Sequence, residues 1–299
     1  MIEQLKHASV GTPITRGGVT LIPVYLQQDS PQILTGVDAE VEVTEQPGAE
    51  VPTLVATNRH GVPVLVAEGE TLNGGWQNRV VNVSVLLPAN GSLDIPVSCV
   101  EAGRWGGDRT FDRRGPKAPR RVRRGATRSV TENLQFDQTR HSDQGLVWAM
   151  VSDELRGLDV ENHSAAVEGL IDHERRNADV AAAIADLVRR GPLRGQCGVI
   201  VAHGRRIVAL DVYATPEMLA ASWENLVRGY FLEVRRAPSG TPSATKALRF
   251  LTKIANRVVS TQPGVGLGDE LRISSSKITG QALVYEGALV HASAFALAA

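Results

Sequence analysis

Short runs rich in Val, Ile and Leu, broken at near-regular intervals by Gly, Pro, Asn and Asp, constrain the fold more than any other feature. Runs of this length separated by turn formers are typical of strands in an antiparallel sandwich or barrel. We therefore expect an all-β part over residues 1–111, with PANG (88–91) as a hairpin turn. The runs are VTLIPVYL (19–26), VEVTE (41–45), VPTLVAT (51–57), VPVLVAE (62–68), RVVNVSVLL (79–87) and LDIPVSCV (93–100).

The segment 112–128, DRRGPKAPRRVRRGATR, interrupts this pattern with eight Lys or Arg residues, two prolines and two glycines. A run of like charges with turn residues is usually solvated, so we expect an exposed basic loop or linker. Such a loop can contact phosphate, in a nucleic acid or a dinucleotide, but it lacks the interleaved aromatic residues that stack on bases.

Helical and strand-like patterns are mixed over residues 129–299, and we expect this part to pack on the first. The predicted fold class is α+β: an N-terminal antiparallel β-sandwich or barrel-like part, followed by a mixed helix and antiparallel-sheet part. The predicted elements are helices over 130–155, 164–190 with Ser164 as a cap, 216–235 after a Thr215 cap, and 243–259, a hairpin over 196–213, and three closing strands after Asp269.

Composition narrows the class of protein. The chain has 299 residues, with 32 Lys plus Arg and 32 Asp plus Glu, and this balance argues against a dedicated nucleic-acid-binding protein. Its two cysteines make no disulfide framework, its seven histidines form no HExxH motif, and we expect neither a metal nor a cofactor. No apolar stretch is long enough for a membrane span, and the N-terminus lacks the apolar core of a signal peptide, so we expect a cytoplasmic location.

Polar side chains are densest in GETLNGGWQNRVVNVSV (69–85) and SCVEAGRW (98–105). One interpretation is a polar pocket at the end of a sheet, in which Arg79 or Arg104 holds an anion, amides select a sugar or base, and Trp105 stacks. The other is a buried hydrogen-bond network that fixes a tight turn at Gly74 and Gly75. The residues concerned are Glu70, Asn73, Gln77, Asn78, Arg79, Asn82, Glu101, Arg104 and Trp105.

Two further residues have a functional and a structural interpretation each. Cys99 lies in a strand-like run with no histidine nearby in sequence, which favours a buried inert thiol over a nucleophile. Asp211 ends the second hairpin strand just before Thr215, where it can orient a ligand or help to start the following helix by its charge.

The long polar motif resembles the ARPP-1 domain, a domain associated with ADP-ribosylglycohydrolase and rhodanese-phosphatase superfamily proteins. The resemblance lies in Gly69-Glu70, Gln77-Asn78-Arg79, Asn82 and the run from Ile95 to Trp105. The segment VIVAHGRRIVALDVYATPEMLAASWENLVRGYFLE and the closing strands also fit the family's pattern. The resemblance implies a ligand derived from NAD or ADP-ribose and a setting in prokaryotic conflict or stress systems, without establishing catalysis.

Three hypotheses about function follow. The first is binding or sensing of an ADP-ribose-like nucleotide or an ADP-ribosylated partner, through Asn73, Gln77, Asn78, Arg79, Asn82, Arg104, Trp105 and Asp211. The second is a hydrolase or transferase acting on such a nucleotide, with Glu70 or Glu101 as general base. The third is a protein-interaction scaffold that uses the basic loop 112–128 as its contact.

Overall fold

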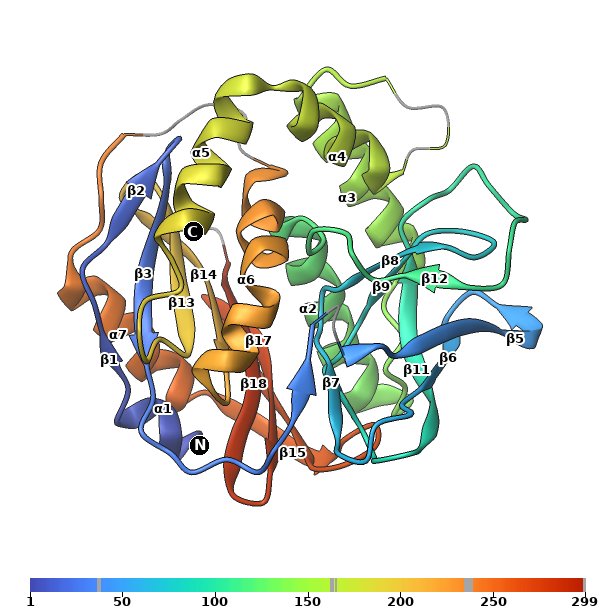
Figure 1. The fold of residues 1–299 in the computed structure, drawn as a ribbon, viewed down its shortest axis with the longest axis horizontal. Helices are drawn as coiled ribbons and strands as arrows, with labels where there is room; N and C mark the ends of the chain where they lie inside the picture. The colour runs from blue at the N-terminus through green and yellow to red at the C-terminus, as the bar shows by residue number, and fades with distance from the viewer. Residues whose placement is uncertain (37–38, 162–163, 165, 234–238, 298–299) are drawn as a thin grey trace.

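The structure is a computed structural model that describes residues 1–36, 39–161, 164, 166–233 and 239–297. It is a mixed α and β fold with two main sheets and helices around them (Figure 1). The predicted α+β class is confirmed. Among the described residues, no helix combines the length and the apolar character needed to cross a bilayer.

The larger sheet is antiparallel and joins both ends of the described chain. The strand β3 (Val19–Tyr25) pairs with β13 (Gly198–His203), so the predicted N-terminal β part contributes strands to the sheet of the second half. In spatial order the sheet contains β1 (Ser9–Val10), β3, β13, β14 (Arg206–Tyr213), β18 (Ala288–Ala296), β17 (Ile278–Tyr285), β16 (Asp269–Ser274) and β15 (Val258–Pro263), with β2 (Ile14–Arg16) paired to β3.

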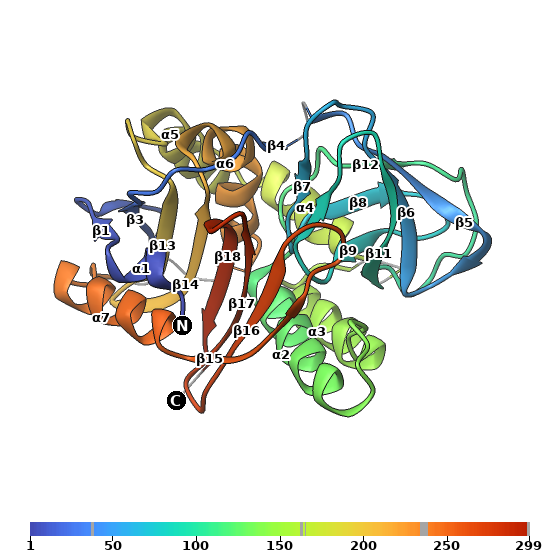
Figure 2. The ribbon, with the colours of Figure 1, turned by 90° about the horizontal axis from the view of Figure 1, so that it is seen from below.

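Both faces of this sheet are covered by helices, which explains its almost continuous apolar strands. One face packs on α5 (Ala178–Arg190) and α6 (Pro216–Phe231), and the other packs on α1 (Glu3–Lys6) and α7 (Ala244–Ala255). Figure 2 shows α5 and α6 on one side of the sheet and α7 on the other.

The second large sheet is barrel-like and holds most of the predicted polar motif. Its edge strands β5 and β12 approach each other, because Thr44 forms a bridge with Thr110 next to β12, and the sheet nearly closes. Its spatial order is β12 (Phe111–Asp112), β8 (Thr71–Gly74), β9 (Arg79–Val81), β11 (Ser92–Cys99), β6 (Thr53–Thr57) and β5 (Glu42–Glu50). A small sheet of β10 (Val85–Leu87), β7 (Val64–Val66) and β4 (Leu34–Thr35) adjoins it.

The segment 112–128 is not an exposed loop, so that prediction is wrong. Residues from Arg120 onward form α2 (Arg120–Phe136). The single helix predicted over 130–155 is instead the end of α2 and most of α3 (Gln144–Gly157), with a break between them. Val122 and Ala126 are four apart and face the core, and Lys117 and Arg123 are both 2% exposed. Buried cations need partners, and Arg123 of α2 finds them in Glu68, in the turn after Val66, and in Asp211 of β14, so this helix links the two parts of the molecule.

The remaining elements agree with the sequence patterns in most cases. The hairpin of β13 and β14 and the three closing strands are confirmed, and the Thr215 and Ser243 side chains cap α6 and α7. The predicted helix over 164–190 is instead two helices, α4 (Val167–Arg176) and α5, separated at Asn177, and Ala166 rather than Ser164 is the N-cap of α4. Helix α3 (Gln144–Gly157) completes the set, while residues 234 and 235 of the predicted helix over 216–235 lie outside the described residues.

The turn PANG connects β10 to β11, and Asn90 adopts a positive φ there as expected. The two flanking strands do not pair along their length around it. Strand β10 pairs with β7, and β9 pairs with β11 through Val81 and Val97. The single run 79–87 is therefore two strands that belong to different sheets.

Candidate functional site

Four of the predicted residues meet in one hydrogen-bond network beside the β8–β9 hairpin. Arg104 donates from Nε and Nη2 to the two carboxylate oxygens of Glu101, at 3.0 and 2.7 Å. Its remaining N–H groups reach the carbonyl oxygens of Gly74, Gly75 and Gly106. The Asn78 backbone N–H donates to Glu101, and the Gln77 amide donates to the Glu101 carbonyl oxygen. All five N–H groups of the guanidinium have partners, so Arg104 holds the turn together and offers no free donor to an anion.

Glu101 is ionised more readily than an ordinary glutamate. Burial would raise the pKa of its carboxyl group, but the hydrogen bonds from Arg104 and from the Asn78 backbone outweigh burial and lower the pKa. A general base near neutral pH requires a raised pKa, so this direction is opposite to the one the enzyme hypothesis needs at Glu101.

Arg79 is fully buried between the strands of the barrel-like sheet. Its Nη1 donates to the Gln77 carbonyl oxygen at 2.9 Å, and its Nη2 lies 4.0 Å from the Glu45 carboxylate. Neighbouring Cys99 is also fully buried, and burial raises the pKa of its thiol, in line with an inert cysteine. Neither group reaches the surface, where a ligand would meet it.

Asn82 and Asp211 lie apart from this network. The Asn82 side chain accepts a hydrogen bond from Ser98 at 2.7 Å and donates to the Arg140 carbonyl oxygen. Asp211 lies on β14, where its carboxylate accepts from Arg123 Nη2 at 2.6 Å and from the Tyr230 hydroxyl. The predicted site residues therefore occupy several places rather than a single pocket.

The Asp211 environment is a buried charge cluster, defined by Glu68, Lys117, Arg123, Asp211 and His291. Arg123 also donates to both carboxylate oxygens of Glu68, at 3.1 and 2.8 Å, and Lys117 donates to the Glu68 carbonyl oxygen at 2.7 Å. Burial alone would raise the pKa of Asp211, but Arg123 and Lys117 bring it below the ordinary value. The cluster links α2 to the turn between β7 and β8 and to β14 of the larger sheet.

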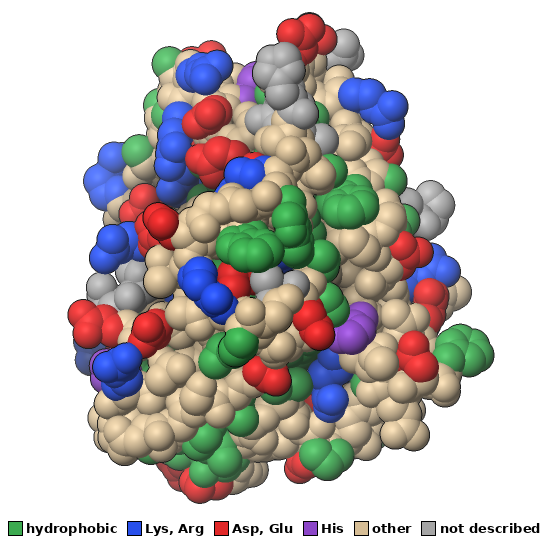
Figure 3. Space-filling model, turned by 90° about the vertical axis from the view of Figure 1, so that its right-hand side faces the viewer, with side chains coloured by type: hydrophobic (Ala, Val, Ile, Leu, Met, Phe, Trp, Pro, Cys, Tyr) green, Lys and Arg blue, Asp and Glu red, His purple; other side chains and the backbone are tan. Residues whose placement is uncertain are grey.

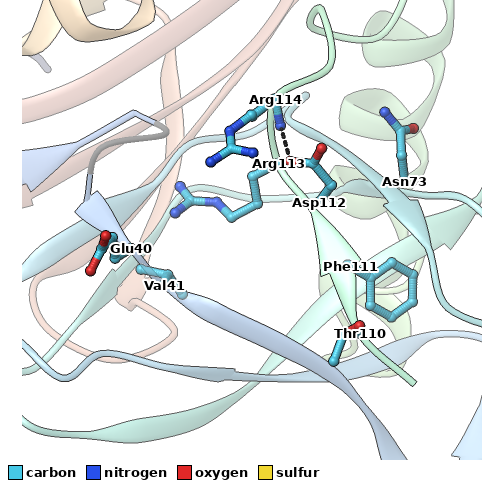
Figure 4. A pocket seen from close by; sticks show the side chains of 8 residues that line it. All are labelled: Glu40, Val41, Asn73, Thr110, Phe111, Asp112, Arg113 and Arg114. Carbon is cyan, nitrogen blue, oxygen red and sulfur yellow. Dashed lines mark hydrogen bonds between the residues drawn. The ribbon is translucent and has the colours of Figure 1, made fainter. Parts of the chain in front are cut away.

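An open hollow lies at the edge of the barrel-like sheet, next to β12 (Figure 4). Its volume is about 490 Å³, within the range of small-molecule sites. Asn73 is the one predicted site residue on its wall, and the chain directly after β12 brings two arginines to it. The lining residues are Glu40, Val41, Asn73, Thr110, Phe111, Asp112, Arg113 and Arg114.

The two arginines of this hollow differ in how firmly their side chains are held. Arg113 is 7% exposed, and its Nε and Nη2 donate to one oxygen of Glu70 at 3.1 and 2.8 Å. Its Nη1 is buried and finds no hydrogen-bond partner among the described residues. Arg114 is exposed, and Figure 4 shows both guanidinium groups directed to the same side of the hollow. A buried, fixed guanidinium and an exposed one side by side can clamp a phosphate or diphosphate.

Tight packing holds Phe111 beside this hollow. Gly75 adopts a positive φ of 53°, and a Cβ placed there would lie 2.0 Å from the Phe111 ring. The ring therefore rests directly on the glycine backbone of the hairpin. An aromatic ring fixed in this way offers a stacking surface for a base.

Trp105 is 53% exposed and lies outside the hollow's lining. Its ring meets Trp76 edge-on, with 5.2 Å between ring centroids. On the face that the barrel-like part presents, hydrophobic side chains gather near the middle and charged side chains surround them (Figure 3).

Sequence reasoning missed Arg113, Lys117 and Arg123, because it treated the basic segment as solvated. One signal was present: Val122, Ala126 and Val130 repeat at helical spacing through the Arg-rich run, which indicates one buried helix face. Within the described residues, no group of three or more His, Cys, Asp or Glu side chains could hold a metal ion.

Comparison with known proteins gives one match. The chain matches no curated protein and no solved structure. The model of ARPP-1, the ARG and Rhodanese-Phosphatase-superfamily-associated Protein domain, matches residues 7–295. Since this match covers nearly the whole chain and includes both sheets, the protein belongs to the ARPP-1 domain family.

Proposed function

We propose that the protein binds an ADP-ribose-like nucleotide, free or attached to a protein partner, in the hollow beside β12. Arg113 and Arg114 hold the diphosphate, the Asn73 amide contacts a sugar hydroxyl, and Phe111 stacks on the base. The carrying observation is that two guanidinium groups, of Arg113 and Arg114, line one hollow, and that the buried Arg113 Nη1 has no hydrogen-bond partner among the described residues. A buried unpaired N–H is costly, so a bound anion would relieve a penalty already present in the folded chain.

The family name supports the choice of ligand. ARPP-1 is named for association with ARG and rhodanese-phosphatase superfamily proteins, and ADP-ribosylglycohydrolases act on ADP-ribose linkages. A partner of such proteins is expected to meet ADP-ribose or ADP-ribosylated molecules. The choice of the hollow is supported by its two arginines, because Arg79 is fully buried and the donors of Arg104 are all used within its own turn.

Isothermal titration with ADP-ribose, AMP and ribose 5-phosphate tests the proposal. ADP-ribose should bind more tightly than AMP, and raising the salt concentration should weaken both, because the contacts are charged. Arg114→Ala should weaken ADP-ribose binding by about tenfold or more, since hydrogen bonds to charged groups contribute roughly 1.5–3 kcal/mol.

Arg176→Ala is the matched control. It removes another exposed guanidinium, 82% accessible on α4, that does not line the hollow. The Arg176→Ala variant should bind ADP-ribose with the same affinity as the parent chain. Absence of binding by any of the three ligands at millimolar concentration, or equal effects of the two variants, would refute the proposed site.

For the enzyme hypothesis, Glu70 is a better candidate for the general base than Glu101. The Glu70 carboxylate accepts from Arg113 and from the Ala67 backbone N–H, and it also lines a second, inner recess. Glu101 is occupied by Arg104. A catalytic role for the chain therefore depends on what the inner recess can do.

A further inference from the structure

The outer hollow has an acidic end as well as its two arginines. Figure 4 shows Glu40 on one side of the hollow and Phe111 with Asn73 on the other, and the guanidinium groups of Arg113 and Arg114 lie between them. Along the hollow, a carboxylate is therefore followed by a basic middle and then by an aromatic ring with an amide. A ligand that fills the whole space needs a matching group for each part.

The Glu40 carboxylate is free to receive a ligand. It is exposed and makes no hydrogen bond or ion pair with any described residue. Neighbouring carboxylates are occupied, because Asp112 accepts from the Arg114 backbone N–H at 2.9 Å and Glu42 pairs with Arg59 at 2.6 Å. Glu40 also forms no ion pair within 4.0 Å with either arginine of the hollow, so opposite charges line one space without closing it.

The backbone at Glu40 is strained. Its φ is 35°, in the left-handed region that glutamate rarely adopts. The adjacent residues Ala39 and Val41 are 2% and 7% exposed, and the Ala39 carbonyl oxygen lies 2.8 Å from His60 Nε2. Buried neighbours therefore fix this backbone while the side chain between them lines the hollow. Glycine would adopt this φ without strain, so a glutamate here points to a role for its carboxylate.

The order of groups along the hollow matches ADP-ribose from its base to its last sugar. With adenine on Phe111, the first ribose lies near Asn73 and the diphosphate lies on the two arginines. The second ribose then lies beyond the arginines, at the end that Glu40 lines. Its 2′ and 3′ hydroxyl groups are adjacent donors, and a carboxylate can accept from both through its two oxygens.

We propose that Glu40 determines specificity for the terminal ribose, because its carboxylate accepts hydrogen bonds from the hydroxyl groups of the sugar beyond the diphosphate. The inference rests on the proposed nucleotide site and names the part of the ligand that distinguishes ADP-ribose from ADP. At this point ADP ends in a phosphate that carries a further negative charge. The same carboxylate therefore attracts ADP-ribose and repels ADP.

Isothermal titration of the full chain with ADP-ribose and with ADP tests the assignment. Glu40→Gln keeps the side-chain shape and removes its charge. This variant should bind ADP-ribose about fivefold more weakly, because a charged acceptor becomes a neutral one. It should bind ADP about twofold more tightly, because a repulsion is lost, and this gain should shrink as the salt concentration rises. The preference for ADP-ribose over ADP should thus fall about tenfold.

Glu42→Gln is the matched control. It removes an exposed carboxylate two residues away that pairs with Arg59 and does not line the hollow, so both affinities should equal those of the parent chain. Glu40→Gly is a second variant, whose backbone adopts a positive φ without strain. Its Tm should stay close to that of the parent chain, while its affinity for ADP-ribose falls.

The outcomes separate this inference from the proposed function. Opposite changes in the two affinities of Glu40→Gln would support the terminal ribose at Glu40. If both ligands bind and depend on Arg114, but Glu40→Gln changes the two affinities equally or not at all, the assignment of Glu40 is wrong and the nucleotide site stands. If neither ligand binds the parent chain at millimolar concentration, both proposals are refuted.

Discussion

Neutralising Asp211 tests whether the buried charge cluster fixes the two sheets together. In Asp211→Asn the side-chain shape is kept, but Arg123 loses an ionised partner at 2.6 Å and the Tyr230 hydroxyl loses a charged acceptor. The cluster then holds Arg123 and Lys117 against the single carboxylate of Glu68. Arg123 and Asp211 are both almost fully buried, so water cannot screen the imbalance.

Removing one partner of a buried ion pair costs about 3–5 kcal/mol, because the other charge stays buried without compensation. That loss is a large part of the roughly 5–15 kcal/mol by which domains are stable. We expect Asp211→Asn to lower the free energy of unfolding by this amount at pH 7.5. Urea unfolding followed by circular dichroism measures the change.

Asp172→Asn is the matched control, since the ion pairs of Asp172 with described residues are exposed ones on α4, at 3.6 Å to Arg175 and 3.9 Å to Arg176. Exposed pairs contribute about 0–1 kcal/mol, so this variant should unfold almost as the parent chain does. The double variant Arg123→Met with Asp211→Asn should be less destabilised than the sum of the single changes by more than about 1 kcal/mol, because both act on one interaction. A loss below about 1 kcal/mol in Asp211→Asn would refute the reasoning.

Two other predictions concern His291 and Glu101. Burial and the Lys117 charge hold the pKa of His291 well below 6.5, so only the unfolded chain takes up a proton there as the pH falls. As the pH drops below 6.5, this residue should lower the free energy of unfolding by up to about 1.4 kcal/mol per pH unit. His291→Asn should make the free energy of unfolding depend less steeply on pH, as measured by urea unfolding at pH 7.5, 6.5 and 5.5. An unchanged pH dependence would contradict the assignment. Glu101→Gln should lower the free energy of unfolding by about 1–3 kcal/mol, less than for a fully buried pair because the Arg104 side chain is 34% exposed. The affinity for ADP-ribose, measured by calorimetry, should not change. A loss of affinity in this variant would place the ligand at Arg104 instead.

The sequence predicts local structure well wherever one pattern acts alone. The Thr215-Pro216 start of α6 and the tight turn at Gly204 were predictable, because capping and turn chemistry depend on a few adjacent residues. The barrel-like sheet was also predictable from its alternating runs. The pairing of β3 with β13 was not, since residues almost two hundred positions apart leave no mark on each other's local pattern.

The candidate site was only partly predictable for the same reason. The motif 69–85 does contain Glu70 and Asn73, which line the recess and the hollow. Charge alone could not distinguish Arg104, whose donors are all used within its own turn, from Arg113, which keeps one free. The difference arises from which carbonyl oxygens the fold brings close, and residue type does not encode that.

The position of β18 in the larger sheet has a consequence for how the chain acquires its fold. This last strand lies between β14 and β17, so both of those strands have an unpaired edge until residues 288–296 arrive. Open hydrophobic strand edges invite pairing with other chains. A ribosome must therefore deliver the residues up to Ala296 before the sheet can close, and nascent chains that stall earlier should be efficient clients of chaperones.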